Sequence, residues 1–483
     1  MNVPIRRLFV VITLLFALLA AKTSWWTVAR SDELERSADN SRDLLRGLKI
    51  RRGLIRAADG TVIARSVKNS EGVYSRRYPL GSVFAHPVGY SFVRTTQSGL
   101  ESFYNRELSR GASSGARSLL DDLSGDSGPG DDLRTTLDPK AQELAQRLLQ
   151  QEAPVTGGSV VALDPRDGRV LVMASSPTYV PKTASTPGGL AKLNKDELRD
   201  PLVDRSLQFG YAPGSTMKVV TLTAALDSGQ YSLQDKVNGD NGVKISGVAL
   251  ENDYGKSWGN IDLTTALTNS VNTAFAQVAE KLGKKTMRTY MERFGFDSKP
   301  KLDYPKGSMS ASGEYRKGEL LPPTSTYVDV GRMGIGQDKL QVTGLQMAEV
   351  AAAVANGGKL MRPHIGDRFV DADGRTTKRI GARLQATVMK PQTAADVTKA
   401  MISVVEKGTG TKAQIPGVVV AGKTGTAETT TGQGQPNKLW FIAFAPAAHP
   451  RVAIAVTVDE TQGFGGDVAA PIAKSVMQEL LKR

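Results

Sequence analysis

Three short motifs in this sequence combine residue types that can activate a serine. The first is Ser215-Thr216-Met217-Lys218, which follows a Pro-Gly turn and opens an apolar run typical of a helix. Residues three apart share a helix face, so the pattern predicts Lys218 beside Ser215. A serine is a weak nucleophile until a base removes its proton, and a neutral lysine can be that base. The alternative interpretation is a serine that caps the helix beside a solvated lysine.

The second motif is Ser270-Val271-Asn272, close to the start of a long predicted helix. The triplet alone is almost meaningless, because Ser-x-Asn is common by chance. In combination with the first motif the triplet has a chemical use, since Ser270 can relay a proton between two lysines and a leaving amine. Asn272 can hold Lys218 and a substrate amide in place. A lysine is neutral only if its pKa is lowered, and burial beside Lys423 would do this.

The third motif is GKTGT, which follows an apolar segment predicted to be a strand. The hydroxyls of Thr424 and Thr426 and the charge of Lys423 suit a terminal carboxylate of a substrate. Gly425 has no side chain and would let a substrate approach the strand backbone closely. The N–H groups of Ser215 and Thr426 are candidates for an oxyanion hole. Together the three motifs predict acyl transfer through an acyl-serine intermediate.

The segment 417–424 also matches the pattern of a nucleotide-binding P-loop, G-x-x-x-x-G-K-[ST]. A P-loop needs a glycine-rich loop between a strand and a helix. Here three consecutive valines favour a strand in place of the loop, and the following TAETTTGQGQPN is a poor helix former. We therefore interpret Lys423 as part of an acyl-transfer site.

The composition excludes several other chemistries. The chain has 483 residues and no cysteine, which rules out disulfides, thiolate zinc sites and a cysteine nucleophile. Its three histidines, His86, His364 and His449, are far apart, so neither a His-rich metal site nor a Ser-His-Asp triad is favoured. We expect no metal and no cofactor. The formal net charge of +14 suits an anionic partner such as a membrane surface, a cell-wall polymer or a nucleic acid, but does not choose among them.

The N-terminus predicts a membrane anchor. Arg6 and Arg7 precede the apolar run 8–21, and a lysine and two tryptophans follow it. A helix that continues to Val28 is about 31 Å long, enough to span a membrane. No clean Ala-x-Ala site follows the run, so an uncleaved anchor is favoured over a cleaved signal peptide. The arginines before the span predict a cytoplasmic N-terminus, with everything after the anchor on the far side.

The rest of the chain divides into two predicted regions after the tail at 1–7 and the anchor at 8–29. Residues 30–133 contain a polar stalk, short β-like runs with a hairpin turn at Asp59-Gly60, and a linker rich in Gly, Ser and Asp. Residues 134–483 begin with a helix and a hairpin, have a helix-rich middle, and end with three strand-like runs and a helix. This order predicts one α+β domain whose sheet is built from both of its ends.

These motifs and their surroundings resemble the class B penicillin-binding proteins, which are monofunctional peptidoglycan D,D-transpeptidases, and most of all the compact A type of actinobacteria. The resemblance covers nearly the whole chain. It rests on the three motifs and on the stretches GLIRAADGTVIARS, GLESFYN, VDRSLQFGYAPGSTMK, GQDKLQVTGLQMAEVAAAVANGGKLMRPH and GGDVAAPIA. The chain departs from the family at Ala57-Ala58, which replace a usual pair, and at Gly344, where proline is common.

The resemblance implies an antiparallel sheet flanked by helices, an all-helical subdomain, and a small membrane-proximal domain at 30–133. It implies Ser215 as nucleophile and Lys218 as its base, and it assigns the remaining site residues to the second and third motifs: Ser270, Asn272, Lys423, Thr424 and Gly425. The implied partners are peptidoglycan stem peptides, β-lactam antibiotics, the plasma membrane, and a polytopic glycan polymerase with division or elongation proteins docked on residues 51–108. No nucleic acid is expected.

Three alternatives remain open at this point. The same fold also serves D,D-carboxypeptidases and β-lactam sensors, and a catalytically silent cell-wall scaffold is a third possibility. Relative to class A β-lactamases, Val271 replaces an aspartate and their deacylating glutamate motif has no obvious match, which favours a transpeptidase over a hydrolase. The complete set of motifs argues against a silent scaffold.

Overall fold

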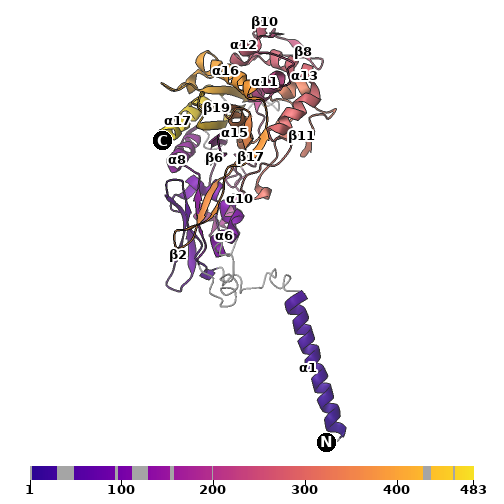
Figure 1. Cartoon of the computed structure of the whole chain (residues 1–483), viewed down its shortest axis with the longest axis vertical. Helices are drawn as coiled ribbons and strands as arrows, with labels where there is room; N and C mark the ends of the chain where they lie inside the picture. Colours follow the sequence, from indigo (N-terminus) through magenta and orange to yellow (C-terminus); the bar gives the residue numbers. More distant parts are fainter. Residues whose placement is uncertain are drawn as a thin grey trace.

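The computed structural model describes residues 3–29, 48–92, 96–110, 129–152, 157–197, 199–427, 437–460 and 463–482. Helix α1 (Val3–Ala29) stands apart from the rest of the described chain (Figure 1). Its segment Val3–Thr23 is apolar, fully exposed and long enough to cross a membrane, as the sequence predicted. Most of the predicted stalk and of the linker, residues 30–47 and 111–128, lies outside the described residues.

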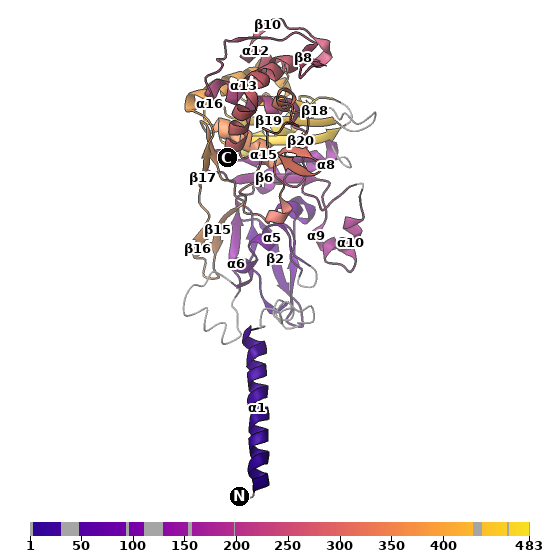
Figure 2. The ribbon, with the colours of Figure 1, turned by 90° about the vertical axis from the view of Figure 1, so that its right-hand side faces the viewer.

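A six-stranded sheet in the order β16-β15-β4-β1-β2-β3 forms the part of the molecule nearest α1 (Figures 1 and 2). The predicted hairpin at Asp59-Gly60 is confirmed, because β1 and β2 pair as antiparallel neighbours around it. Strand β4 joins this hairpin to β15, which comes from much later in the chain. The strands are β1 (Ile55–Arg56), β2 (Val62–Lys68), β3 (Tyr74–Arg77), β4 (Asp132–Thr135), β15 (Gly366–Val370) and β16 (Thr376–Arg379).

A five-stranded antiparallel sheet in the order β18-β19-β20-β5-β6 forms the centre of the larger region. Two strands come from its start and three from the end of the chain, which confirms a sheet built from both ends. Helices α8 and α17 pack on one face of this sheet and α15 on the other. The bounds are β5 (Gly158–Leu163), β6 (Val170–Ser176), β18 (Ala421–Ala427), β19 (Asn437–Ala445), β20 (Val452–Glu460), α8 (Pro139–Glu152), α15 (Gly344–Ala355) and α17 (Ala469–Leu481).

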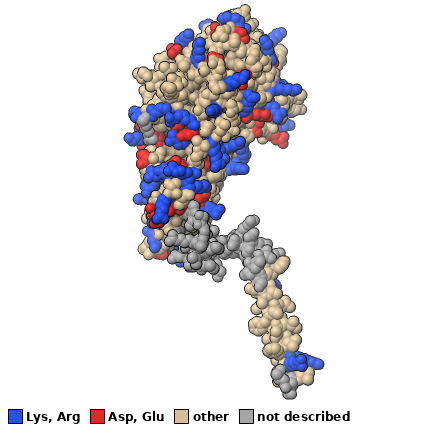
Figure 3. Space-filling view, in the orientation of Figure 1, with Lys and Arg blue, Asp and Glu red and all other residues tan. Residues whose placement is uncertain are grey.

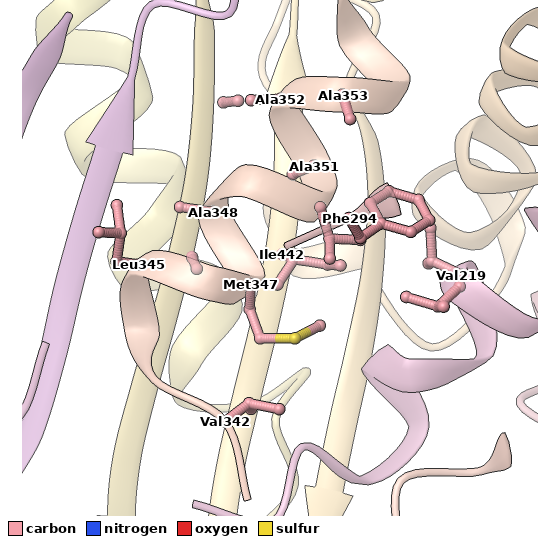
Figure 4. Packing of buried hydrophobic residues seen from close by; sticks show 14 of the residues in the cluster. Val219, Phe294, Val342, Leu345, Met347, Ala348, Ala351, Ala352, Ala353 and Ile442 are labelled. Atoms are coloured by element: carbon pink, nitrogen blue, oxygen red, sulfur yellow. The ribbon is translucent and has the colours of Figure 1, made fainter. Parts of the chain in front are cut away.

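The hydrophobic core joins the sheet to the helical region above it. Figure 4 shows Leu345, Met347 and Ala348 of α15 near Ile442 of β19, with Val219 of helix α11 (Lys218–Asp227) close by. All five side chains are completely buried. Because core side chains are close-packed, this cluster fixes the position of α11 relative to the sheet.

The helical region lies next to the central sheet and has short hairpins at its outer edge (Figure 2). Its helices are α11 (Lys218–Asp227), α12 (Leu263–Thr268), α13 (Asn272–Arg293), α14 (Val330–Gly334) and α16 (Pro391–Lys407). Its strands are β7 (Lys236–Asn238), β8 (Val243–Ile245), β9 (Val248–Leu250), β10 (Asn260–Asp262), β11 (Gly313–Arg316), β12 (Glu319–Leu321), β13 (Leu340–Gln341), β14 (Lys359–Met361) and β17 (Leu384–Thr387).

Short helices complete the structure. They are α4 (Ala85–Val88), α5 (Gly99–Phe103), α6 (Asn105–Arg110), α9 (Pro181–Ala184) and α10 (Gly189–Asn194), with the 3-10 turns η1 (Gly81–Phe84), η2 (Gly214–Met217), η3 (Asp253–Gly255), η4 (Lys306–Ser308) and η5 (Thr411–Ala413).

Two local predictions are wrong. Ser215 does not cap a helix, because it lies inside η2 and α11 begins only at Lys218. Gly214 makes this possible, since its φ of 51° lets the chain turn sharply just before the serine. The valines 418–420 are not the strand that precedes GKTGT, because β18 starts at Ala421 and contains the motif itself. Pairing with β19 decides where β18 begins, and this pairing cannot be read from local sequence.

Candidate active site

The buried amine of Lys218 lies at the centre of the site. Lys218 is the first residue of α11 and its side chain has no exposed surface. Its Nζ donates hydrogen bonds to Ser215 Oγ at 2.9 Å, to Asn272 Oδ1 at 2.6 Å and to the backbone oxygen of Ser270 at 2.6 Å. When this amine is neutral, its lone pair can accept the hydroxyl proton of Ser215 instead. The geometry therefore fits a serine with a lysine base.

The turn that carries Ser215 is held in place from two sides. The N–H of Gly214 donates to the backbone oxygen of Gly336 at 3.0 Å, and the indole N–H of Trp440 on β19 donates to the backbone oxygen of Ala212 at 2.9 Å. These bonds fix the turn against both the helical region and the sheet. A nucleophile on such a turn is preorganised, which limits the reorganisation needed during reaction.

Ser270 connects the two lysines. Lys423 Nζ donates to Ser270 Oγ at 2.9 Å, and Lys218 Nζ lies 3.3 Å from the same oxygen. Ser270 has a φ of 58°, a left-handed conformation that is uncommon for serine. This conformation sits one residue before the N-cap of α13, where strained backbone is often part of a functional site. The hydroxyl is placed to pass a proton between the amines.

Both lysines have lowered pKa values. Burial is the largest cause for Lys218, whose pKa falls well below its usual value, and the neighbouring charge of Lys423 lowers it further. Burial lowers the pKa of Lys423 to about 7, and the negative charge of Asp253 opposes this shift. Both shifts favour the unprotonated form of the amines. The Lys218 amine can then act as a base rather than as a fixed cation.

The strand β18 forms the opposite wall. The N–H of Gly465 donates to Thr426 Oγ1 at 3.3 Å, and the hydroxyls of Thr424 and Thr409 lie 2.6 Å apart. A Cβ on Gly425 would lie 2.8 Å from the backbone oxygen of Pro213. The glycine is thus required for the close approach of the strand to the turn η2, a different reason from the substrate access expected from the sequence.

The structure brings all the predicted site residues together. Ser215, Lys218, Ser270, Asn272 and Lys423 form one hydrogen-bonded network, and the third motif continues along β18 beside it. The position of Lys423 within a sheet strand, with its amine on Ser270, excludes the P-loop geometry. Within the described ranges, no group of three or more His, Cys, Asp or Glu side chains could hold a metal ion.

Two residues of the site were missed by sequence reasoning. Asp253 Oδ1 lies 3.4 Å from Asn272 Nδ2, and Thr409 contacts Thr424 through its hydroxyl. Thr409 stands between two glycines after a predicted helix, which marks only a loop. Asp253 lies in a polar stretch with no motif. Both reach the site through tertiary folding alone.

Comparisons with known proteins agree with this geometry. The penicillin binding protein transpeptidase domain matches residues 158–478, and the penicillin binding protein A dimerisation domain matches residues 52–133. The peptidoglycan D,D-transpeptidase PbpA of Mycolicibacterium smegmatis is 32% identical over 100% of this chain and 99% of its own length. Stage V sporulation protein D of Bacillus subtilis is 31% identical over 84% of this chain and 64% of its own length.

Solved structures show the same likeness. Penicillin-binding protein A of Mycobacterium tuberculosis, as a ceftriaxone acyl-enzyme complex, superposes with a TM-score of 0.80 at 32% identity and covers 91% of this chain and 100% of its own. Its penicillin G acyl-enzyme complex superposes with a TM-score of 0.78 at 31% identity and covers 90% of this chain and 100% of its own. Together with the network of Ser215 and the buried lysines, these likenesses establish that the chain belongs to the penicillin-binding protein transpeptidase family.

Proposed function

We propose that this protein is a membrane-anchored serine D,D-transpeptidase that cross-links peptidoglycan stem peptides through an acyl-Ser215 intermediate, with Lys218 as the base. The observation that carries the assignment is the buried Lys218 amine, which lies 2.9 Å from Ser215 Oγ and contacts the second motif. The family relationship supports both the donor substrate, a peptide ending in D-Ala-D-Ala, and covalent reaction with β-lactams.

In the acylation step, neutral Lys218 accepts the proton of Ser215, and Oγ attacks the carbonyl carbon of the penultimate D-Ala. The peptide bond to the terminal D-Ala breaks, and the leaving nitrogen receives a proton through Ser270. The N–H groups of Ser215 and Thr426 are the proposed oxyanion hole. Lys423, Thr424 and Thr426 are the proposed contacts for the terminal carboxylate.

In the second step, the amine of another stem peptide attacks the ester carbon of acyl-Ser215. A new C–N bond forms, the C–Oγ bond breaks, and the proton lost by the amine returns to Ser215 through Lys218 and Ser270. Water in place of the amine would give a carboxypeptidase, so the acceptor decides between the two activities. The three motifs serve either acceptor.

The test of the nucleophile is covalent labelling of the full-length protein with a fluorescent penicillin, followed by mapping of the modified peptide. Ser215→Ala should abolish the label. The matched control is Ser228→Ala just after α11, whose hydroxyl donates only to the backbone oxygen of Ala225. Normal labelling of Ser215→Ala, or label on another serine, would refute the assignment. With peptide substrates, release of free D-Ala without cross-linked product would favour the carboxypeptidase.

The proposed location is the plasma membrane, with a single span, a cytoplasmic N-terminus and the catalytic domain outside. The apolar exposed helix α1 and the two arginines near its start support this orientation. Lysine and arginine side chains also gather on the visible face of the part nearest α1 in Figure 3, which suits an anionic surface. Intact-mass analysis of protein extracted from membranes should find residues 1–29 retained. A mature chain that starts after Ala21 or Ala29 would mean a cleaved signal.

The proposed protein partners are a polytopic glycan polymerase and components of the division or elongation machinery, docked on residues 51–108. Their support is the family relationship together with the separate sheet formed around β1 to β3. Crosslinking of the full-length protein in membranes, followed by mass spectrometry, should join partner peptides to this region. Crosslinks confined to the region around α13 and α16 would contradict this docking surface.

A further inference from the structure

Two exposed aromatic side chains meet beside the catalytic network. Tyr254 lies on η3 and is 89% exposed, and Phe464 lies in the segment before α17 and is 42% exposed. Their ring centroids are 5.8 Å apart with an interplanar angle of 52°. Tyr254 also has a φ of 58°, which is unusual for a bulky residue. Exposed aromatic rings and a rare backbone conformation together suggest a binding role rather than core packing.

The two rings come from opposite walls of the site. Asp253, the neighbour of Tyr254, accepts a hydrogen bond from the amide of Asn272 at 3.4 Å. Gly465, the neighbour of Phe464, donates its N–H to Thr426 Oγ1 at 3.3 Å. Each ring is therefore one residue away from a contact with a catalytic motif. The aromatic pair therefore connects the segment that contacts α13 with the segment that contacts β18.

An exposed carboxylate lies next to Tyr254 in the sequence. Asp253 accepts a hydrogen bond from Asn272 Nδ2 but forms no ion pair with the described residues. The cation on its own loop, Lys256, is instead directed at the indole of Trp258, with Nζ 3.6 Å from the ring centroid. The charge of Asp253 still acts on the site, because it partly opposes the lowering of the pKa values of Lys218 and Lys423 by burial. A negative charge and two π faces thus border a site that is otherwise rich in buried amines.

We propose that Asp253, Tyr254 and Phe464 form a subsite for the ammonium group of the stem peptide that acts as acyl acceptor. The proposal rests on the transpeptidase function above and specifies its second substrate as a cationic amine. A carboxylate and aromatic faces attract an ammonium group, whereas the lysine and hydroxyls of the third motif suit the donor carboxylate. The two substrates would thus be distinguished by charge. The bound amine gives up its proton to the site base before it attacks the ester.

The test compares two fates of one acyl-enzyme. Full-length protein in detergent micelles is acylated with an N-acyl-D-alanyl thioester, and the ratio of amide product to hydrolysed acid is measured. One acceptor is a stem peptide with a free, cationic side-chain amine, and the other is hydroxylamine, which is uncharged at neutral pH. Asp253→Asn removes a negative charge that acts on both lysines, so it also changes the rate of acylation. The ratio is insensitive to that rate, because both products come from the same intermediate.

We expect Asp253→Asn to lower the ratio about two- to fivefold for the cationic peptide, the range for an exposed charge contact, and to leave it unchanged for hydroxylamine. Tyr254→Leu should reduce the ratio in the same selective way. Added salt should reduce the difference in this product ratio between wild type and Asp253→Asn, because salt screens exposed charges. The matched control is Glu251→Gln, a charge change on the same loop, which should not alter either ratio.

Two results would overturn the proposal: an unchanged ratio with the cationic peptide, or an equal loss with both acceptors, since the latter indicates a general disturbance of the site. Failure of the proposed function looks different. In that case the wild-type protein forms no acyl-enzyme with the thioester or with penicillin in intact-mass spectra, and the subsite proposal falls with it.

Discussion

Lys423 is the residue for which the P-loop and acyl-transfer interpretations of the sequence predict different experimental results. Its amine is completely buried, donates to Ser270 Oγ at 2.9 Å, and contributes to the lowered pKa of Lys218. Lys423→Met keeps most of the volume and removes the charge and the hydrogen bond. Loss of a charge-assisted hydrogen bond costs about 1.5 to 3 kcal/mol, so acylation by a carboxylate-bearing β-lactam should slow roughly ten- to a hundredfold.

The pH profile of the same variant gives a second, independent readout. The positive charge of Lys423 lowers the pKa of Lys218, so its removal raises that pKa. Because Lys218 acts as base only when neutral, the acid limb of the acylation rate should move to higher pH. Lys423→Arg should be less impaired, since it keeps the charge, but still slower than wild type, because a guanidinium does not exchange protons.

The assay is stopped-flow or gel-based acylation with a fluorescent penicillin between about pH 5.5 and 9. Lys412→Met on the exposed turn η5 is the matched control for the loss of one positive charge. ATP should leave the melting temperature of the protein unchanged. The acyl-transfer role of Lys423 is refuted if penicillin acylates Lys423→Met at the wild-type rate with an unshifted pH–rate profile. It is also refuted if ATP stabilises the wild type and not the variant.

Three further changes test the surroundings of the site. Gly425→Ala should lower both the melting temperature, by an amount equivalent to about 1 to 3 kcal/mol, and the rate of penicillin labelling, because its Cβ would lie 2.8 Å from the backbone oxygen of Pro213. Thr409→Val should raise KM for a carboxylate-bearing donor more than it lowers kcat, because Thr409 orients the hydroxyl of Thr424. Glu349→Gln should raise the melting temperature at pH 9 but not at pH 5, because burial raises the pKa of this carboxyl to about 8.

The sign of the last prediction follows from proton linkage. A carboxyl whose pKa is raised in the folded state binds its proton more tightly there, so its contribution to stability is lost as the pH rises through about 8. Glutamine cannot ionise and avoids this loss. Exposed Glu406→Gln and Gly381→Ala, where nothing lies within 4 Å of the added Cβ, are the controls. Equal effects of Glu349→Gln at both pH values would contradict the linkage argument. An unchanged melting temperature and labelling rate for Gly425→Ala, or a change in kcat alone for Thr409→Val, would contradict the other two predictions.

The sequence alone was sufficient to predict the chemistry of the site. The serine and lysine of the first motif, the second motif and GKTGT are local patterns, and each residue type has a direct chemical use. The hairpin and the strand-like runs at the two ends of residues 134–483 likewise predicted the central sheet, because short apolar runs bounded by turn signals are typical of buried strands. The apolar helix at the N-terminus was as clear, since length and composition alone indicate a span.

Tertiary structure decided what depends on contacts between distant segments. Ser215 lies in a 3-10 turn whose first residue, Gly214, forms a backbone hydrogen bond with Gly336. Strand β18 begins where its pairing with β19 begins. Residues 366–379 join the N-terminal sheet through β4, although nothing local to them indicates it. Asp253 and Thr409 reach the site in the same way. Local propensity acts over a few residues, whereas these positions are fixed by contacts between separate segments of the chain, which no local pattern encodes.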